Sequence, residues 1–276
     1  MKTKKTVNQK LKRIFLSLLL PAAMTASVTC NAQNNSGIPP HQMRVASYNI
    51  QHGMGMDNQL NYKRIAKMLR AISPDVVALQ EVDSMTQRTN NTYALGEIAE
   101  QLNYYASYAP AIDFEGGKYG IGILSRERPI SVRQYALPGS EEARTLLVAE
   151  FDDFVFASTH LSLTEADRIA SIGIIEEAAK KSGKPFVVAG DLNAQPDSPF
   201  IRQFEEKFQI CSGKQKSWPA DKPTECLDYI AAYKRKSTSK NGKGGAQQPA
   251  VTLFSDVLNT QASDHRPIVA EIVLPR

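Results

Sequence analysis

Cysteine is scarce in this chain of 276 residues, which contains Cys30, Cys211 and Cys226 and no other. Their spacing does not match the paired cysteines of a zinc site, so a cysteine-built metal centre is excluded. In an oxidising compartment Cys211 and Cys226 could close a short disulfide loop, or both could be small buried residues. The sequence leaves both open, because a bridge needs Cα atoms within about 7 Å of each other.

A basic excess is also missing from most of the chain, although the full sequence has a formal net charge of +5. The first 32 residues hold six of the 33 basic residues and none of the 28 acidic ones, so the remainder has a net charge of −1. A nonspecific nucleic-acid binder is expected to keep a basic surface. The exceptions are Lys214, Lys216 and the tract from Lys234 to Lys243, which we interpret as a solvated loop rather than a phosphate-binding patch.

The apolar stretch Ile14–Met24 is too short to span a membrane. It follows a lysine-rich segment and precedes small residues that end at Ala32, which is the pattern of a secretory signal. We therefore predict a cleaved signal peptide over residues 1–32, a polar lead-in over 33–42 and a periplasmic or extracellular protein. Cys30 could instead be the lipidated first residue of a lipoprotein, although the residue before it fits that signal poorly.

The rest of the chain has no internal repeat and alternates helical and strand-like segments. Apolar spacing predicts helices over 62–72 and 95–102, and Thr164 with Asp167 predicts a capping box for a helix that ends near residue 183. Strands are predicted at 44–49, 76–80, 120–125, 146–151, 154–159, 186–189, 227–232, 251–258 and 268–273.

These elements predict one α/β domain over residues 43–276. The pattern alone does not distinguish one doubly wound sheet from two stacked sheets. Residues 234–250 are rich in Lys, Ser, Gly and Gln, so we predict a mobile loop between late strands there.

Polar side chains recur where the predicted strands end. Asp191 and Asn193 follow one apolar run, and residues two apart on an extended chain point to the same side, so both can face one small object. Asp264 and His265 precede another apolar run. A hard divalent cation takes oxygen ligands and a histidine can move a proton near neutral pH, so this combination suits metal-assisted chemistry on a phosphate. Further polar residues at strand ends are Asn49, Glu81 and His160, and Asp228 lies inside another short apolar segment.

As an ordered set over about residues 43–274, these motifs resemble the endonuclease/exonuclease/phosphatase superfamily. This group of divalent-metal phosphodiesterases and phosphatases includes DNase I, abasic-site endonucleases, sphingomyelinases and inositol phosphatases. The chain departs from the family pattern at Leu227, where isoleucine is usual, and at Ile121, where many relatives carry a polar residue that bears on a secondary phosphate contact. The matching motifs are Tyr48-Asn49, Leu79-Gln80-Glu81, Thr159-His160, Gly190-Asp191-Leu192-Asn193, Asp228-Tyr229-Ile230 and Ser263-Asp264-His265.

The resemblance implies a DNase I-like four-layer sandwich, in which two stacked β-sheets are flanked by helices and the active site lies at one end. It also implies a hydrolase that depends on Mg²⁺ or Mn²⁺. The expected metal residues are Glu81, as the main carboxylate ligand, with Asn49 and Asp264.

The same resemblance assigns roles to the other polar residues. His160 and His265 would flank the phosphate, and Asp191 would orient and deprotonate the attacking water, unless His265 paired with Asp264 is the base. Asn193 would donate a hydrogen bond to phosphate or water. Asp228 would orient His160 or assist the leaving group, and Arg144 would either add positive charge or form a salt bridge at the rim.

The predicted function is a secreted, divalent-metal-dependent phosphoesterase that hydrolyses its ester by in-line attack of water. The opening Tyr48–Gly53 resembles the bacterial branch near sphingomyelinases, and no large insert of the kind used by duplex binders is present. Small or lipid-derived esters are therefore expected to be better substrates than duplex DNA, for a monomer without a stable protein partner. The alternatives are a secreted scavenging nuclease and a catalytically inactive binding protein on the same fold. The chain has a polar residue at every site position that the family pattern expects, which argues against the inactive protein.

Overall fold

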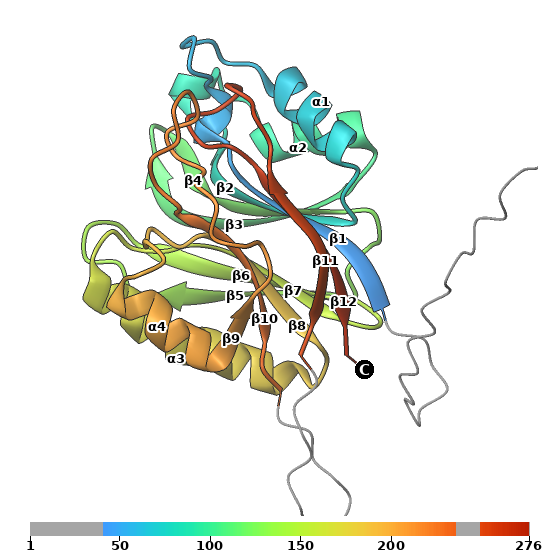
Figure 1. The fold of residues 1–276 in the computed structure, drawn as a ribbon. Helices are drawn as coiled ribbons and strands as arrows, with labels where there is room; N and C mark the ends of the chain where they lie inside the picture. Colours follow the sequence, from blue (N-terminus) through green and yellow to red (C-terminus); the bar gives the residue numbers. More distant parts are fainter. Residues whose placement is uncertain (1–40, 236–248, 276) are drawn as a thin grey trace, which may run out of the picture. The chain divides into compact units, whose positions relative to one another are not determined.

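The computed structural model describes residues 41–235 and 249–275 (Figure 1). The predicted signal peptide, residues 33–40 of the predicted lead-in and residues 236–248 of the predicted loop lie outside the described residues. The described residues belong to one compact unit. None of their helices is long and apolar enough to cross a membrane.

Two six-stranded sheets of mixed strand direction form the centre of this unit (Figure 1). In spatial order the first sheet contains β11 (Val251–Val257), β12 (Ile268–Leu274), β1 (His41–Asn49), β2 (Val76–Ser84), β4 (Gly117–Ser125) and β3 (Tyr105–Phe114). The second contains β5 (Ser131–Leu137), β6 (Arg144–Glu150), β7 (Val155–His160), β8 (Phe186–Asp191), β10 (Asp228–Tyr233) and β9 (Phe208–Ile210). The helices are α1 (Tyr62–Ile72), α2 (Ala94–Leu102), α3 (Glu165–Ser182) and α4 (Pro199–Lys207), with short 3₁₀ turns η1 (Gln51–Gly53) and η2 (Gln87–Thr89).

The sheets stack face to face, with α1 and α2 on the outer face of the first and α3 and α4 on the outer face of the second (Figure 1). Successive side chains of a strand point to opposite faces, so the central strands, which are covered on both faces, are apolar on both. In β8, Val187 and Ala189 pack between the sheets, whereas Phe186 and Val188 pack beneath α3 and α4. The four-layer sandwich expected from the family resemblance is confirmed.

Helix α1 has the predicted bounds, begins with a hydrogen bond from the Arg64 N–H to Asn61 Oδ1 (3.2 Å) and ends at Ser73 in the left-handed conformation. The helix predicted after Thr164 is also present, but the capping box is wrong. The Thr164 side chain makes no capping bond, and the Asp167 carboxylate instead accepts from the Ser140 N–H (2.7 Å) and the Ser162 hydroxyl (3.1 Å). A neighbouring loop therefore uses the carboxylate that the motif assigned to the helix.

The sequence analysis missed β3, β5, β9 and α4. Strands β3, β5 and β9 lie at sheet edges. Several side chains of β3 and β5 are exposed and β9 has only three residues, so none of them shows a continuous apolar run. Cys211 packs between the sheets and Cys226 packs on the α3–α4 side of the second sheet, and both are free thiols.

The strand directions bring the polar strand ends to one rim. Strands β1 and β2 are parallel, as are β7 and β8, whereas β12 runs antiparallel to β1 and β10 antiparallel to β8. In the second sheet Asp191 is in register with both His160 and Asp228. The carboxyl ends of β1, β2, β7 and β8 therefore meet the amino ends of β10 and β12.

Candidate active site

Asn49 links the two sheets at this rim. Its side-chain Nδ2 donates to Glu81 Oε1 at 3.0 Å and to Asp191 Oδ2 at 3.2 Å. The Asn49 amide oxygen accepts from the backbone N–H of Gln51 at 3.2 Å, because η1 begins directly after β1. Asn49 thus presents its amide nitrogen to the two carboxylates and bridges them. Its expected role, as an amide ligand of the metal or in orienting a water, stays a prediction.

A β-bulge aims Glu81 at Asn49. The pairing of β2 with β4 shifts register between Leu79 and Val82, and both of these residues pack on the helix side of the sheet. In a regular strand, Glu81 would share the face of Leu79 beneath α1 and α2. Glu81 adopts φ +55°, in the left-handed region that is uncommon for a residue with a long side chain. Such local strain is concentrated at functional sites.

The surroundings of Glu81 oppose a negative charge. Burial raises the pKa of its carboxyl from 4.5 to about 7, and the carboxylates of Asp264 and Asp191 act in the same direction. The hydrogen bond from Asn49 and the imidazole of His265 act against this rise. Several carboxylates thus crowd one partly buried space, which is the donor chemistry that a hard divalent cation takes.

Asp191 ends β8 at a point where the backbone of β7 approaches closely. A Cβ on the preceding Gly190 would lie 2.0 Å from the backbone oxygen of Thr159, so only glycine fits there. Asp191 Oδ2 lies 3.7 Å from the Nε2 atoms of both His160 and His265. The carboxylate therefore stands between two imidazoles.

Asn193 is placed differently from the sequence expectation. The strand ends at Asp191, and Asn193 has φ +50°, so the extended-chain argument for a shared side fails. Its backbone N–H donates to Asp191 Oδ1 at 2.9 Å, and its side-chain Nδ2 donates to the backbone oxygen of Leu161 at 2.9 Å. Asn193 closes a turn that holds the Asp191 carboxylate, and its amide N–H is directed to the backbone.

His265 is held by Asp228 and not by Asp264. Its Nδ1 lies 2.9 Å from Asp228 Oδ2, which also accepts from the buried hydroxyl of Ser217 at 2.5 Å. The predicted pairing of Asp228 with His160 is likewise replaced by this bond. Burial acts to lower the pKa of His265, but the carboxylates of Asp228, Asp191 and Asp264 outweigh it and raise the pKa to about 10.

His160 has the opposite electrostatic balance. Burial lowers its pKa from 6.5 to about 4, although the Asp191 carboxylate acts to raise it. The nearby Arg144 adds to the lowering, and this arginine forms salt bridges with Glu141 (3.3 Å) and Glu142 (3.1 Å), which is the rim alternative of the prediction. The two site histidines therefore differ in charge near neutral pH.

Two serines fix the site: Ser263, which the sequence analysis placed in a motif without a role, and Ser217, which it missed. The Ser263 hydroxyl donates to the backbone oxygen of Asn49 at 2.8 Å and so ties the segment of Asp264 and His265 to the end of β1. Ser217 lies in the connection before β10, where no motif marks it. Ser217 and Asp228 lie on separate segments, so their proximity is seen only in the folded structure.

The donor set fits a divalent cation. Among the described residues, one group of three potential ligands lies close enough to share an ion, namely Asp191, Asp228 and His265, with ligand atoms within 4.8 Å. This group differs from the predicted set of Asn49, Glu81 and Asp264. Its Asp228 Oδ1 is buried without a hydrogen-bond partner in the described part of the chain, whereas Asp228 Oδ2 is already bonded to Ser217 and His265.

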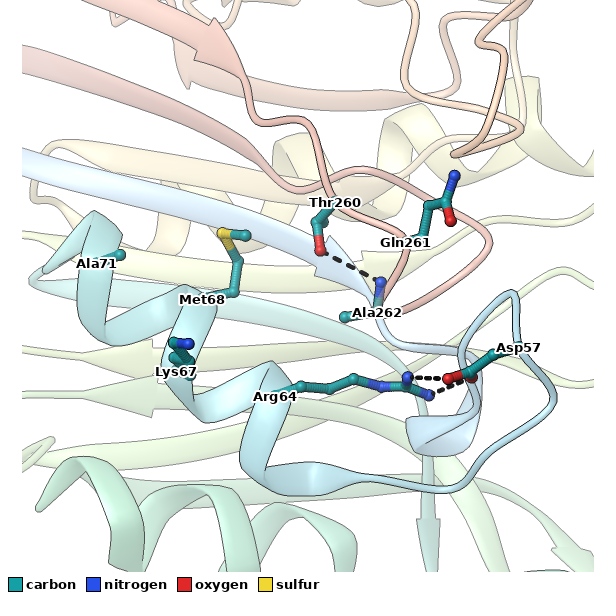
Figure 2. Close-up of a pocket in the computed structure, with 8 residues that line it drawn as sticks. All are labelled: Asp57, Arg64, Lys67, Met68, Ala71, Thr260, Gln261 and Ala262. Atoms are coloured by element: carbon teal, nitrogen blue, oxygen red, sulfur yellow. Dashed lines mark hydrogen bonds and ion pairs between the residues drawn. The ribbon is translucent and has the colours of Figure 1, made fainter.

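Two hollows adjoin the rim from different sides. One of about 310 Å³ includes Glu81 in its lining. The other, of about 390 Å³, lies between α1 and the segment Thr260–Ala262 that leads into Ser263 (Figure 2). In this second hollow Arg64 is bound by Asp57 at 2.8 and 2.9 Å.

Comparison with known proteins identifies the family of this chain. Residues 46–265 match the Endonuclease/Exonuclease/phosphatase family. The chain belongs to this family. Its members are hydrolases that act on phosphate esters, and the family is generally dependent on divalent metals. Among curated proteins, none matches the sequence.

Solved structures share the fold at low sequence identity. An endonuclease/exonuclease/phosphatase family protein from Bacteroides thetaiotaomicron is 18% identical with a TM-score of 0.69, over 87% of this chain and 100% of that chain. A mannosyl-6-phosphatase from the same organism is 18% identical with a TM-score of 0.66, over 84% and 99%. The human Nocturnin catalytic domain is 16% identical with a TM-score of 0.61, over 85% and 95%. These identities establish a common fold.

Proposed function

We propose that this protein is a phosphoester hydrolase that uses Mg²⁺ or Mn²⁺ and a water molecule attacking in line with the leaving group. The observation that carries the proposal is the bridge made by Asn49, whose Nδ2 lies 3.0 Å from Glu81 and 3.2 Å from Asp191. It joins acids from both sheets beside two histidines. One compact space thus contains a ligand carboxylate, a proton acceptor and imidazole donors, which are the groups that hydrolysis of a phosphate ester needs.

Glu81 and Asp264 are the proposed metal ligands. Asp228 uses its Oδ2 to hold Ser217 and His265, and its Oδ1, which has no partner in the described part of the chain, remains open to the cation. When bound, the cation would neutralise charge on the phosphate and orient the ester. Asn49 keeps the Glu81 and Asp191 carboxylates apart and fixed through its two N–H donors.

Asp191 is the proposed general base. Its Oδ2 lies 3.7 Å from Nε2 of both His160 and His265, so a water beside Asp191 would also be beside the imidazoles that contact phosphate oxygens. Asp228 holds His265 through Nδ1, which leaves Nε2 for the phosphate. Replacing Asp191 with Asn should lower kcat by about 10²-fold or more, measured on any ester that the wild type cleaves.

Small or lipid-derived phosphate esters are the proposed substrates, in preference to duplex DNA. The chain beyond residue 32 has a net charge of −1, which gives little attraction to a polyanion. Two cations near the rim are already paired, Arg88 with Asp83 at 2.6 Å and Arg144 with Glu141 and Glu142. They add little free positive charge for a phosphate backbone.

A panel of monoesters, diesters and duplex DNA, assayed with Mg²⁺, Mn²⁺ or EDTA, tests this function. We expect hydrolysis of small esters that EDTA abolishes and added metal restores, with a shallow dependence on salt. Full activity in excess EDTA would rule out the metal role. Efficient cutting of duplex DNA with a steep salt dependence would replace our substrate assignment with a nuclease.

We also propose that the protein is exported. The support is the cationic and apolar pattern before Ala32. The mass of protein recovered from cells should correspond to a start at Gln33, or to a lipidated Cys30. An intact Met1 terminus on cytoplasmic protein would contradict export.

A further inference from the structure

The 310 Å³ hollow shares Glu81 with the proposed metal site and extends from it over η1 and β4. Its lining includes Gln51 and His52 on one side and Phe114 and Tyr119 on the other. A substrate whose phosphate lies at Glu81 has its ester group within reach of this space. The hollow is therefore positioned to contact the part of the substrate that is not phosphate.

One wall of this hollow is rigid because Arg88 is fixed from two sides. Its Nε and Nη2 donate to the buried Asp83 carboxylate at 2.6 and 2.7 Å. Its guanidinium lies 4.4 Å from the ring centre of Phe114 and 5.4 Å from that of Tyr119. A wall held by a bidentate ion pair and two aromatic rings is ordered before a ligand arrives, so little freedom is lost on binding.

Apart from Glu81, which is assigned to the metal, the charged residues that line the hollow are paired within the protein. Arg88 is neutralised by Asp83, and Glu142, which also lines the hollow, lies 3.1 Å from Arg144. A second phosphate or a carboxylate on the ligand would find no unpaired cation among these lining residues. The charge pattern favours an uncharged ligand group.

Hydrogen-bonding groups remain available in the same wall. His52 lines the hollow, but its Nδ1 is buried, so this nitrogen is not one of the groups that a ligand in the hollow can reach. Gln51 contributes an amide and Tyr119 a phenol hydroxyl. Both Gln51 and His52 have φ in the left-handed region, at +44° and +47°, so the fold holds them in a conformation they would not choose alone.

We propose that this hollow binds the uncharged, hydroxylated portion of a phosphate ester, a sugar or polyol group, while the phosphate lies at Glu81. The proposal rests on the proposed function and specifies its substrate class. A volume of about 310 Å³ is at the small end of ligand sites and suits one sugar ring. Donors and acceptors on several sides match hydroxyl groups, each of which both donates and accepts.

Kinetic selectivity of the full chain tests the proposal. A hexose phosphate and glycerol phosphate are compared with phenyl phosphate, which has no hydroxyl on its leaving group. Tyr119→Phe keeps the ring beside Arg88 and removes one hydroxyl, and Gln51→Asn draws the amide back by one methylene while keeping a residue that tolerates positive φ. Tyr105→Phe, on the exposed part of β3, is the matched control.

We expect each pocket variant to raise KM for the hydroxylated esters about tenfold, the effect of one lost hydrogen bond, and to change kcat/KM for phenyl phosphate less than twofold. The control should leave both unchanged. Equal losses on all esters, or no loss on any, would overturn the proposal.

A binding measurement distinguishes failure of this proposal from failure of the proposed function. If the wild type hydrolyses no ester with Mg²⁺ or Mn²⁺, saturation-transfer NMR with a free methyl hexoside still tests the hollow. A signal in the wild type that weakens in Tyr119→Phe supports sugar binding. No signal, or equal signals in both proteins, refutes it.

Discussion

The two hollows beside the rim differ in a way that size does not reveal. The larger one, between α1 and Thr260–Ala262, contains Arg64 already bound to Asp57, together with apolar groups such as Met68 (Figure 2). The smaller one contains Glu81. Each hollow also has one buried nitrogen without a hydrogen-bond partner among the described residues, Arg64 Nε in the first and His52 Nδ1 in the second. The two hollows therefore differ in Glu81, whose carboxylate is crowded by other acids. A carboxylate without a counter-ion, rather than a larger volume, distinguishes the candidate site.

The carboxylates of the two hollows show the same contrast. Burial raises the pKa of Glu81 to about 7, whereas hydrogen bonds from the Arg64 side chain and the Gln59 backbone lower the pKa of the exposed Asp57. A carboxylate stabilised by an arginine has its counter-ion, and one crowded by other acids lacks it. Substitutions on the two sides should therefore differ sharply in effect.

The largest effect is expected from Glu81→Ala. Loss of the ligand carboxylate should reduce kcat/KM by about 10³-fold or more, with partial recovery at high Mn²⁺, because metal affinity and rate fall together. Activity is measured over a metal titration, and Glu127→Ala, an exposed glutamate away from the rim, is the control. Near-normal activity of Glu81→Ala at low metal would remove Glu81 from the site.

His160 should make the fold sensitive to acid. Burial lowers its folded-state pKa to about 4, against 6.5 in the unfolded chain, so the unfolded chain binds more protons between these values. The stability is present above pH 6.5 and is lost as the pH falls towards 4, by at most about 3 kcal/mol. The groups facing His160 are Asp191 and Glu141, which oppose this shift, and Arg144 and His265, which add to it.

The difference between wild type and His160→Gln in urea unfolding from pH 4 to 7 isolates this contribution. Glu81 gives the opposite slope, since its raised folded-state pKa lets the folded protein hold the proton, but it is present in both proteins. His265 is protonated in both states below pH 6.5 and adds no slope there. Parallel pH profiles for the two proteins would contradict a neutral buried His160.

Ser217→Ala should have a moderate effect. Its hydroxyl donates to Asp228 Oδ2 at 2.5 Å, and the same oxygen faces His265 Nδ1 at 2.9 Å, so Ser217 is a positioning residue that acts through Asp228. We expect kcat to fall about tenfold with little change in KM, and the NMR signal of the His265 Nδ1 proton to shift. A stability loss without these two changes would make Ser217 purely structural.

Ser217 also shows where prediction from sequence ends. Motifs at strand ends located Glu81, Asp191 and His265, because buried strands give clear apolar runs and a site at one rim follows from their order. The partners of these residues did not follow, since Asp228 and His265 are joined by tertiary contacts across 37 positions. The backbone at strand ends departs from regular geometry, and the apolar pattern of the sequence does not reveal such departures. The bulge that turns Glu81 to the site is one example, and the positive φ of Asn193, which made the extended-chain expectation fail, is another.

The smallest effect is expected from Arg64→Gln in the hollow of Figure 2. The lost ion pair joins Arg64 to an Asp57 side chain that is 55% exposed, and such pairs contribute about 0–1 kcal/mol because solvent screens them. The hollow adjoins Thr260–Ala262, which leads to Ser263, yet Ser263 is fixed from the other side by its bond to Asn49. Activity on small esters should therefore stay within about twofold of wild type, and so should the metal concentration that gives half-maximal activity. A tenfold loss of kcat without unfolding would show that the larger hollow communicates with the site, and the contrast between the two hollows would then fail.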